Sequence, residues 1–197
     1  MDRPVAVDLT TPAREQTRAR QPDDSGYVER DGVRLHYEVY GSGEPTVFLL
    51  PTWSIIHSRH WKMQIPYLAR HCRVLTFDGR GNGLSDRPES GYDERDFAAD
   101  ALAVMDATET ERATLVSLSL GAQRALLLAA EQPDRVEGAV FICPAVPLGK
   151  GPVGRSHPWN EELDTDEGWA KYNRHYWLRD YRGFLDFFFA KLFREPH

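Results

Sequence analysis

One serine lies in a pattern that suits nucleophilic catalysis. The segment Ser117-Leu118-Ser119-Leu120-Gly121 follows a strand-like run and precedes an apolar, helix-like segment. A sharp turn between a strand and a helix can hold a serine in a strained backbone conformation, with its hydroxyl projecting above a sheet. The residues two before and two after that serine approach each other, so both must be small, and Ser117 and Gly121 meet this requirement around Ser119. With Ser117 at the centre, Leu115 would clash, so Ser119 is the candidate nucleophile.

Alternating strands and helices must hold this serine in place. Apolar patterning and turn residues predict strands at Tyr27–Arg30, Val33–Tyr40, Thr46–Leu50, Val74–Phe77, Ala113–Val116 and Val136–Cys143. The same patterning predicts helices at Arg59–Arg70, from Asp93 to Ala107, and at Leu120–Gln132. Short connections between these elements indicate an α/β fold, with a mostly parallel sheet covered by helices on both faces. The Asp31-Gly32 hairpin signal adds an antiparallel edge at the N-terminal side.

Composition divides the chain into three parts. Residues 1–25 have no apolar period and are expected to form a disordered tail. Residues 26–148 contain the predicted strands and helices and form the α/β core. Residues 149–197 carry about half of the aromatic side chains, at roughly helical spacing, after a Gly/Pro-rich link. This last part is expected to be a helical lid segment, in which the aromatic stripe either packs as a core or lines a substrate pocket.

Overall composition excludes several classes of protein. The chain has 197 residues, a net charge of -6, 41% hydrophobic residues and 27% charged residues, which is typical of a soluble globular protein. Its mild acidity argues against a nucleic-acid partner, and no apolar run is long enough to span a membrane or to act as a signal peptide. Cys72 and Cys143 form no metal-ligand pattern and are expected to be buried, reduced thiols. We therefore expect a cytoplasmic protein without a metal.

Three stretches resemble the N-terminal part of the α/β-hydrolase superfamily, in the same order and at the same spacing. Residues 27–40, followed by Gly41-Ser42-Gly43, are similar to the opening hairpin of the family. Residues 78–88, with the sequence DGRGNGLSDRP, are similar to its Gly-rich loop after the fourth strand. Residues 132–136 resemble the link from the nucleophile helix to the sixth strand. The resemblance implies an α/β-hydrolase fold and an ester-like, small apolar substrate that is cleaved through an acyl-enzyme.

The resemblance also implies which backbone groups stabilise the oxyanion. Two N–H donors are needed, and the residue after the nucleophile, Leu120, supplies one of them. The family draws the second from the loop after the strand at Thr46–Leu50, where Trp53 occupies the donor position. The chain departs from the family twice: Pro51-Thr52 replaces the usual His-Gly, and Ser117 replaces the usual glycine of the elbow, residues 117–121. Trp53 could instead be an aromatic residue packed beside the sheet.

The family also needs an acid and then a histidine after the nucleophile. No strand is predicted beyond the aromatic segment, and no acid or histidine occupies a matching position. Three histidines follow the nucleophile, namely His157, His175 and His197, and four precede it, namely His36, His57, His60 and His71. We therefore name neither acid nor base, and expect the chain to be truncated before both.

Two other functions stay open alongside a serine hydrolase. The departures from the family pattern also suit a non-catalytic, hydrolase-like module that binds a small ligand or a partner, or a truncated inactive fragment. The loop 50–53 is similar to that of hydrolase-like modules that precede nucleotide-cyclase domains in some actinobacterial proteins. A dinucleotide fingerprint would need a glycine at Leu84, so we expect no cofactor. These residues do not determine the oligomeric state.

Overall fold

The computed structural model describes residues 19–147 and 158–193. The chain divides into two units, Met1–Val146 and Pro147–His197, and each unit is described by itself. Most of the expected tail, residues 1–25, lies outside the described residues. The separation of an α/β core from a lid segment stays a prediction.

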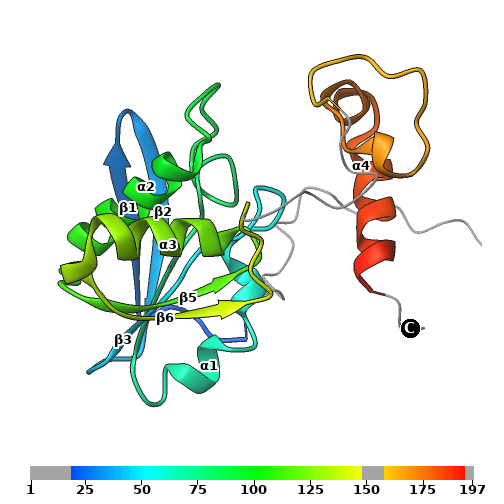
Figure 1. Ribbon diagram of the computed structural model, residues 1–197. Coiled ribbons are helices and arrows are strands. Elements are labelled where there is room, and N and C mark those ends of the chain that lie inside the picture. The colour runs from blue at the N-terminus through cyan, green and yellow to red at the C-terminus, as the bar shows by residue number, and fades with distance from the viewer. Residues whose placement is uncertain (1–18, 148–157, 194–197) are drawn as a thin grey trace, which may run out of the picture. The chain divides into compact units, whose positions relative to one another are not determined.

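A six-stranded sheet forms the first unit, in the order β1-β2-β4-β3-β5-β6 (Figure 1). Its strands are β1 (Asp24–Arg30), β2 (Val33–Tyr40), β3 (Thr46–Leu49), β4 (Arg73–Phe77), β5 (Ala113–Leu118) and β6 (Val136–Ile142). The pairs β1–β2 and β2–β4 are antiparallel, whereas β4, β3, β5 and β6 run parallel. The predicted mostly parallel sheet with an antiparallel N-terminal hairpin is therefore confirmed.

The hairpin between β1 and β2 forms at the predicted turn. Asp31 and Gly32 both have left-handed backbone angles, with φ of 51° and 74°, as a two-residue hairpin turn of this type requires. The ladder extends further toward the N-terminus than the apolar pattern indicated, because Asp23 N–H donates to the Val39 carbonyl at 2.9 Å and β1 begins at Asp24. The expected end of the tail at residue 25 is thus too late, since Asp24 and Ser25 belong to the sheet.

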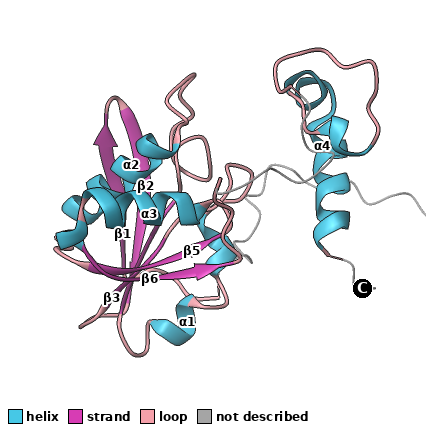
Figure 2. Cartoon of the chain, in the orientation of Figure 1, coloured by secondary structure: helices cyan, strands magenta, loops and turns pink. Residues whose placement is uncertain are grey.

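Helices cover both faces of this sheet, as predicted (Figures 1 and 2). Helices α2 (Glu94–Ala107) and α3 (Gly121–Glu131) lie on one face, and α1 (Ile65–Leu68) lies on the other. The larger core cluster joins strand and helix side chains that are almost fully buried, including Phe48, Leu75, Leu115, Ala101 and Leu128. Asp93 caps α2, as the sequence indicated, because its carboxylate accepts the backbone N–H groups of Arg95 and Asp96.

The single helix predicted at Arg59–Arg70 is wrong. A short 3-10 helix at Ser58–Trp61 is followed, after a turn, by the four-residue helix α1. Pro66 explains the break, because a proline has no N–H to donate and its ring clashes with the carbonyl of the residue four positions earlier. The segment nevertheless buries Trp61 and Ile65 against the sheet, as its apolar spacing requires.

The second unit is built around helix α4 (Arg174–Leu192), which Asn173 caps. The helix is interrupted at Asp180, where φ is -149° and ψ is 73°. Its aromatic side chains pack on one another, with the rings of Trp177 and Phe184 4.5 Å apart and Phe184 fully buried. Packing is therefore one role of this stripe, and its role as a lid stays a prediction. None of the described helices is long and apolar enough to cross a membrane.

Candidate active site

The candidate nucleophile lies in a strained turn at the carboxyl end of β5. Ser119 has a φ of 53°, in the left-handed region that residues other than glycine seldom adopt. Its backbone is held on both sides, since its N–H donates to the Ile142 carbonyl at 3.0 Å and its own carbonyl accepts from Ala122 and Ala145. The turn therefore fixes the backbone of Ser119, while the Ser119 hydroxyl has no hydrogen-bond partner within the described part of the chain.

The two small residues of the elbow, Ser117 and Gly121, are closely surrounded by other atoms. A Cβ atom added to Gly121 would lie 2.8 Å from the Pro51 carbonyl oxygen and 3.6 Å from the Cβ of Ser117. Ser117 is fully buried, and its hydroxyl donates to the Val140 carbonyl at 3.2 Å. A serine can therefore replace the glycine of the family pattern, because its hydroxyl is satisfied by the neighbouring strand β6.

The loop after β3, Pro51-Thr52-Trp53, lies next to the elbow and is called the β3 loop below. The Thr52 hydroxyl donates to the Leu118 carbonyl at 2.8 Å, which ties this loop directly to the last residue of β5. Trp53 is partly buried, and its carbonyl accepts the Ile56 N–H at 3.0 Å. The N–H of Leu120, the other expected donor, has no acceptor among the described residues. The two expected oxyanion donors thus come from neighbouring segments.

Sequence reasoning missed Arg124, a buried arginine in α3. One of its terminal nitrogens donates to two carbonyl oxygens of the β3 loop, those of Pro51 at 2.8 Å and Thr52 at 2.5 Å. Its Nε donates to the Glu94 carboxylate at 2.8 Å, and its guanidinium carbon lies 3.8 Å from the centre of the Phe97 ring. Burial lowers the pKa of Arg124, and the Glu94 carboxylate opposes that shift. The available signal was a single cation within a helix predicted to be strongly apolar.

The Gly-rich loop has a structural role beside the site. The Asp78 carboxylate accepts the N–H groups of Ser58 and Leu84, each at 2.9 Å. A Cβ at Gly83 would overlap that carboxylate, and the φ of Gly83 is 50°, so only glycine fits here. Asp78 therefore joins the Gly-rich loop to the segment that follows the β3 loop.

No histidine among the described residues is hydrogen-bonded to Ser119. His36 is buried with Nδ1 3.9 Å from the Asp78 carboxylate, His60 is enclosed beside Trp61, and His175 contacts the Asn160 carbonyl in the second unit. His157 and His197 lie outside the described residues. The ranges 19–147 and 158–193 contain no group of three or more His, Cys, Asp or Glu side chains that could hold a metal ion. A catalytic base and acid therefore remain unassigned in this chain.

Comparison with known proteins identifies the family. A model of the alpha/beta hydrolase fold matches residues 45–193, so the chain belongs to this family. The 2-hydroxymuconate semialdehyde hydrolase of Pseudomonas sp. is 32% identical over 159 residues, which are 75% of this chain and 52% of that protein. The chain spans about half the length of the curated relatives it matches.

Solved structures give the same result. An N-acyl homoserine lactone degrading enzyme aligns with a TM-score of 0.64 and 31% sequence identity, over 81% of this chain and 54% of its own. The enol-lactonase of Burkholderia xenovorans aligns with a TM-score of 0.54 and 32% identity, over 58% of this chain and 45% of its own. Hydrolases thus recur among the similar proteins, while the roles of Ser119, Leu120 and Trp53 stay predictions.

Proposed function

We propose that this chain supplies the nucleophile and the oxyanion donors of a serine hydrolase that acts on small, apolar, ester-like substrates. The observation that carries the proposal is the left-handed backbone of Ser119 in a strand-to-helix turn. A strained residue of this kind persists only where the surrounding structure holds it, and such residues cluster at active sites. Four hydrogen bonds hold this turn. The Ser119 N–H donates one, the Ser119 carbonyl accepts two, and the Thr52 hydroxyl donates the fourth to the Leu118 carbonyl.

The proposed reaction proceeds in two steps. The Ser119 oxygen attacks the substrate carbonyl, the bond to the leaving alcohol breaks, and an acyl-enzyme forms. The Leu120 and Trp53 N–H groups donate to the negative oxygen of the tetrahedral intermediate. Water then hydrolyses the acyl-enzyme and frees the Ser119 hydroxyl. A base takes the proton from the Ser119 hydroxyl and passes it to the oxygen of the leaving alcohol, and none of the described residues is assigned to this role.

The similar proteins support a carbonyl-containing substrate. Two of the solved structures are described as a lactone degrading enzyme and an enol-lactonase, and a lactone is a cyclic ester. The relatives also include epoxide hydrolases and chloroperoxidases, so family membership by itself does not select the bond that is cleaved. A serine at position 119 favours the ester class, because a serine hydroxyl forms acyl intermediates with carbonyl substrates.

Covalent labelling of Ser119 tests this function. The protein is treated with a fluorophosphonate, and the modified peptide is found by mass spectrometry. We expect one adduct, on Ser119, which the Ser119→Ala variant loses and the matched Ser90→Ala variant keeps, because Ser90 lies exposed in a loop. A well-folded, full-length protein that acquires no adduct on Ser119 would contradict the proposal.

A non-catalytic binding module is the second candidate function. The observation that favours it is that the Ser119 hydroxyl lacks a histidine partner within the described residues. Without a base, a serine hydroxyl is a weak nucleophile at neutral pH. Binding of a small apolar ester that is unchanged by Ser119→Ala, in a protein with no esterase turnover, would favour this second function over the first.

A further inference from the structure

We propose that Arg124 is a positioning residue that sets the orientation of the Thr52–Trp53 peptide and so aims the Trp53 N–H. The inference rests on the proposed function, in which this N–H is an oxyanion donor. Arg124 contacts neither Ser119 nor Leu120 in the hydrogen bonds of the described residues, so it would act through the β3 loop.

The direction of the Trp53 N–H follows from the Thr52 carbonyl. The Thr52–Trp53 peptide bond is trans, and in a trans peptide the C=O and the following N–H point in opposite directions. Because the Thr52 carbonyl oxygen lies 2.5 Å from the Arg124 nitrogen, the Trp53 N–H points away from Arg124. A rotation of this peptide would point the Trp53 N–H in the opposite direction. It would also turn the Thr52 carbonyl oxygen, which repels a negative charge, toward the position of the oxyanion.

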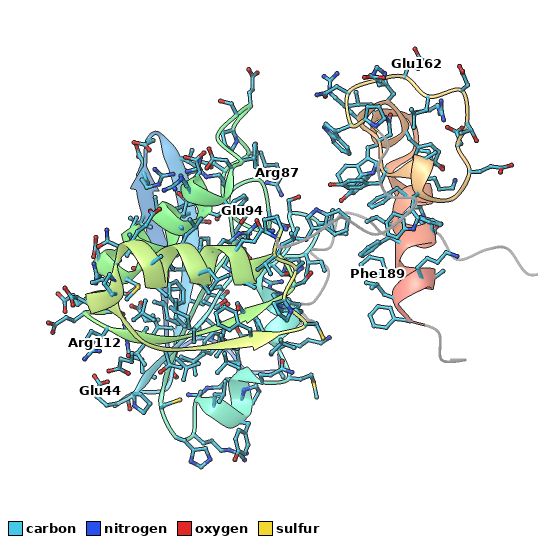
Figure 3. All side chains as sticks on the ribbon, in the orientation of Figure 1. Glu44, Arg87, Glu94, Arg112, Glu162 and Phe189 are labelled. Carbon is cyan, nitrogen blue, oxygen red and sulfur yellow. The ribbon has the colours of Figure 1, made fainter. Side chains whose placement is uncertain are left out.

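Arg124 is itself held so firmly that it can fix this peptide. Only 3% of the Arg124 side chain is exposed, and the Glu94 carboxylate at the start of α2 accepts its Nε–H (Glu94 is labelled in Figure 3). The Phe97 ring lies against the face of the guanidinium, which restricts its rotation. A buried cation that loses a carbonyl acceptor is penalised more than a solvated one, so this environment opposes a flip of the peptide.

The β3 loop is confined on its other sides as well. The Pro51 carbonyl accepts from the same Arg124 nitrogen and lies where a side chain at Gly121 would need space. The Thr52 hydroxyl is bonded to the Leu118 carbonyl. The ring of Pro51 further restricts its own backbone. Arg124 is thus the contact that fixes the carbonyl direction, while the other contacts fix where the loop lies.

The test compares three variants of the whole protein. Arg124→Met removes the cation and keeps much of the length, and Arg124→Lys keeps a cation with a single nitrogen. Arg95→Met is the matched control, since Arg95 is an exposed arginine of α2 whose ion pair is with Glu131. Crystal structures report the orientation of the Thr52–Trp53 peptide, and hydrolysis of a p-nitrophenyl ester reports kcat and KM separately.

We expect Arg124→Met to rotate or disorder this peptide and to lower kcat by about 100-fold, the loss found on removal of one oxyanion donor, with KM little changed. Arg124→Lys should recover part of kcat, and Arg95→Met should match the unmodified protein. An unrotated peptide with unchanged kcat in Arg124→Met overturns the inference. The inference is also overturned if kcat of Arg124→Met falls only in proportion to the loss of folded protein and Arg124→Lys does not restore it.

Two further comparisons distinguish the positioning role of Arg124 from a folding defect and from a failure of the proposed function. If Arg124→Met does not fold, Glu94→Gln weakens the hold on the Arg124 Nε and should change the peptide and kcat in the same direction, to a smaller extent. If the unmodified protein hydrolyses no ester, the proposed function fails. In that case a rotated peptide in Arg124→Met still supports the positioning role, and an unrotated one refutes it.

Discussion

Substitution of Gly121 by alanine tests whether the elbow and the β3 loop are packed as tightly as the structure indicates. Gly121 is the first residue of α3, and its added methyl group would lie 2.8 Å from the Pro51 carbonyl oxygen, which is shorter than the 3.4–4 Å of ordinary contacts. The obstacle is a backbone atom, so it cannot swing aside as a side chain would. Arg124 also holds that oxygen at 2.8 Å, which opposes its retreat.

The size of the effect follows from two opposing contributions. Overpacking of a tight site costs about 1–3 kcal/mol of the free energy of unfolding. The better helix propensity of alanine returns up to about 1 kcal/mol in a helix interior, and less at the first position of a helix such as α3. We expect the Gly121→Ala variant to lose about 1.5 kcal/mol, which lowers Tm by about 3–6 °C for a chain of this size.

Denaturation in urea, followed by tryptophan fluorescence, measures this loss. The matched control is Gly138→Ala, because a Cβ at Gly138 in β6 would meet nothing within 4 Å and its φ is not left-handed. The control should be neutral or more stable by about 0.4–1 kcal/mol, through the lower entropy of its unfolded chain. Equal stability of the two variants would show that the β3 loop moves freely. It would refute the close packing of Gly121 against the Pro51 carbonyl.

Three further predictions concern Ser119, His60 and Asp100. Ser119→Gly should be about 1 kcal/mol more stable than Ser119→Ala in urea denaturation, because glycine removes the strain of the left-handed backbone. Burial lowers the pKa of His60 below 6.5, so the unfolded chain binds the proton first and stability falls as the pH drops below about 6.5; His60→Gln should flatten that fall. Asp100→Asn should cost about 3–5 kcal/mol, because it leaves Arg80 and Arg30 without the buried carboxylate they share.

Each of these three predictions has an outcome that would contradict it. Equal stability of the two Ser119 variants would mean that the turn is not strained. An undiminished pH dependence in His60→Gln, matched by the exposed control His71→Gln, would assign the acid sensitivity to other groups. A loss below about 1 kcal/mol for Asp100→Asn would place the two arginines in contact with water, where ion pairs contribute little.

Sequence alone determined the features that depend on neighbouring residues. The turn at Asp31-Gly32, the cap at Asp93 and the alternation of strands with helices were all predicted, because each arises from local backbone preferences and short-range apolar periodicity. The position of Ser119 between β5 and α3 was found in the same way, from the small residues around it. The break between Trp61 and Ile65, which we attribute to Pro66, was also local, but the helical spacing of the apolar residues concealed it.

Only the tertiary structure decided which distant segments meet at the elbow. The extension of β1 to Asp24 depends on β2 offering backbone partners, which no periodicity in the N-terminal residues reveals. Arg124 lies 72 residues from Thr52 along the chain and appeared in the sequence as one cation in an apolar helix. Its two carbonyl acceptors, and the carboxylate of Glu94, exist as a site only after α2, α3 and the β3 loop have packed together. Local patterns report one segment at a time, whereas the carbonyl contacts of the β3 loop depend on several segments that are distant in the sequence.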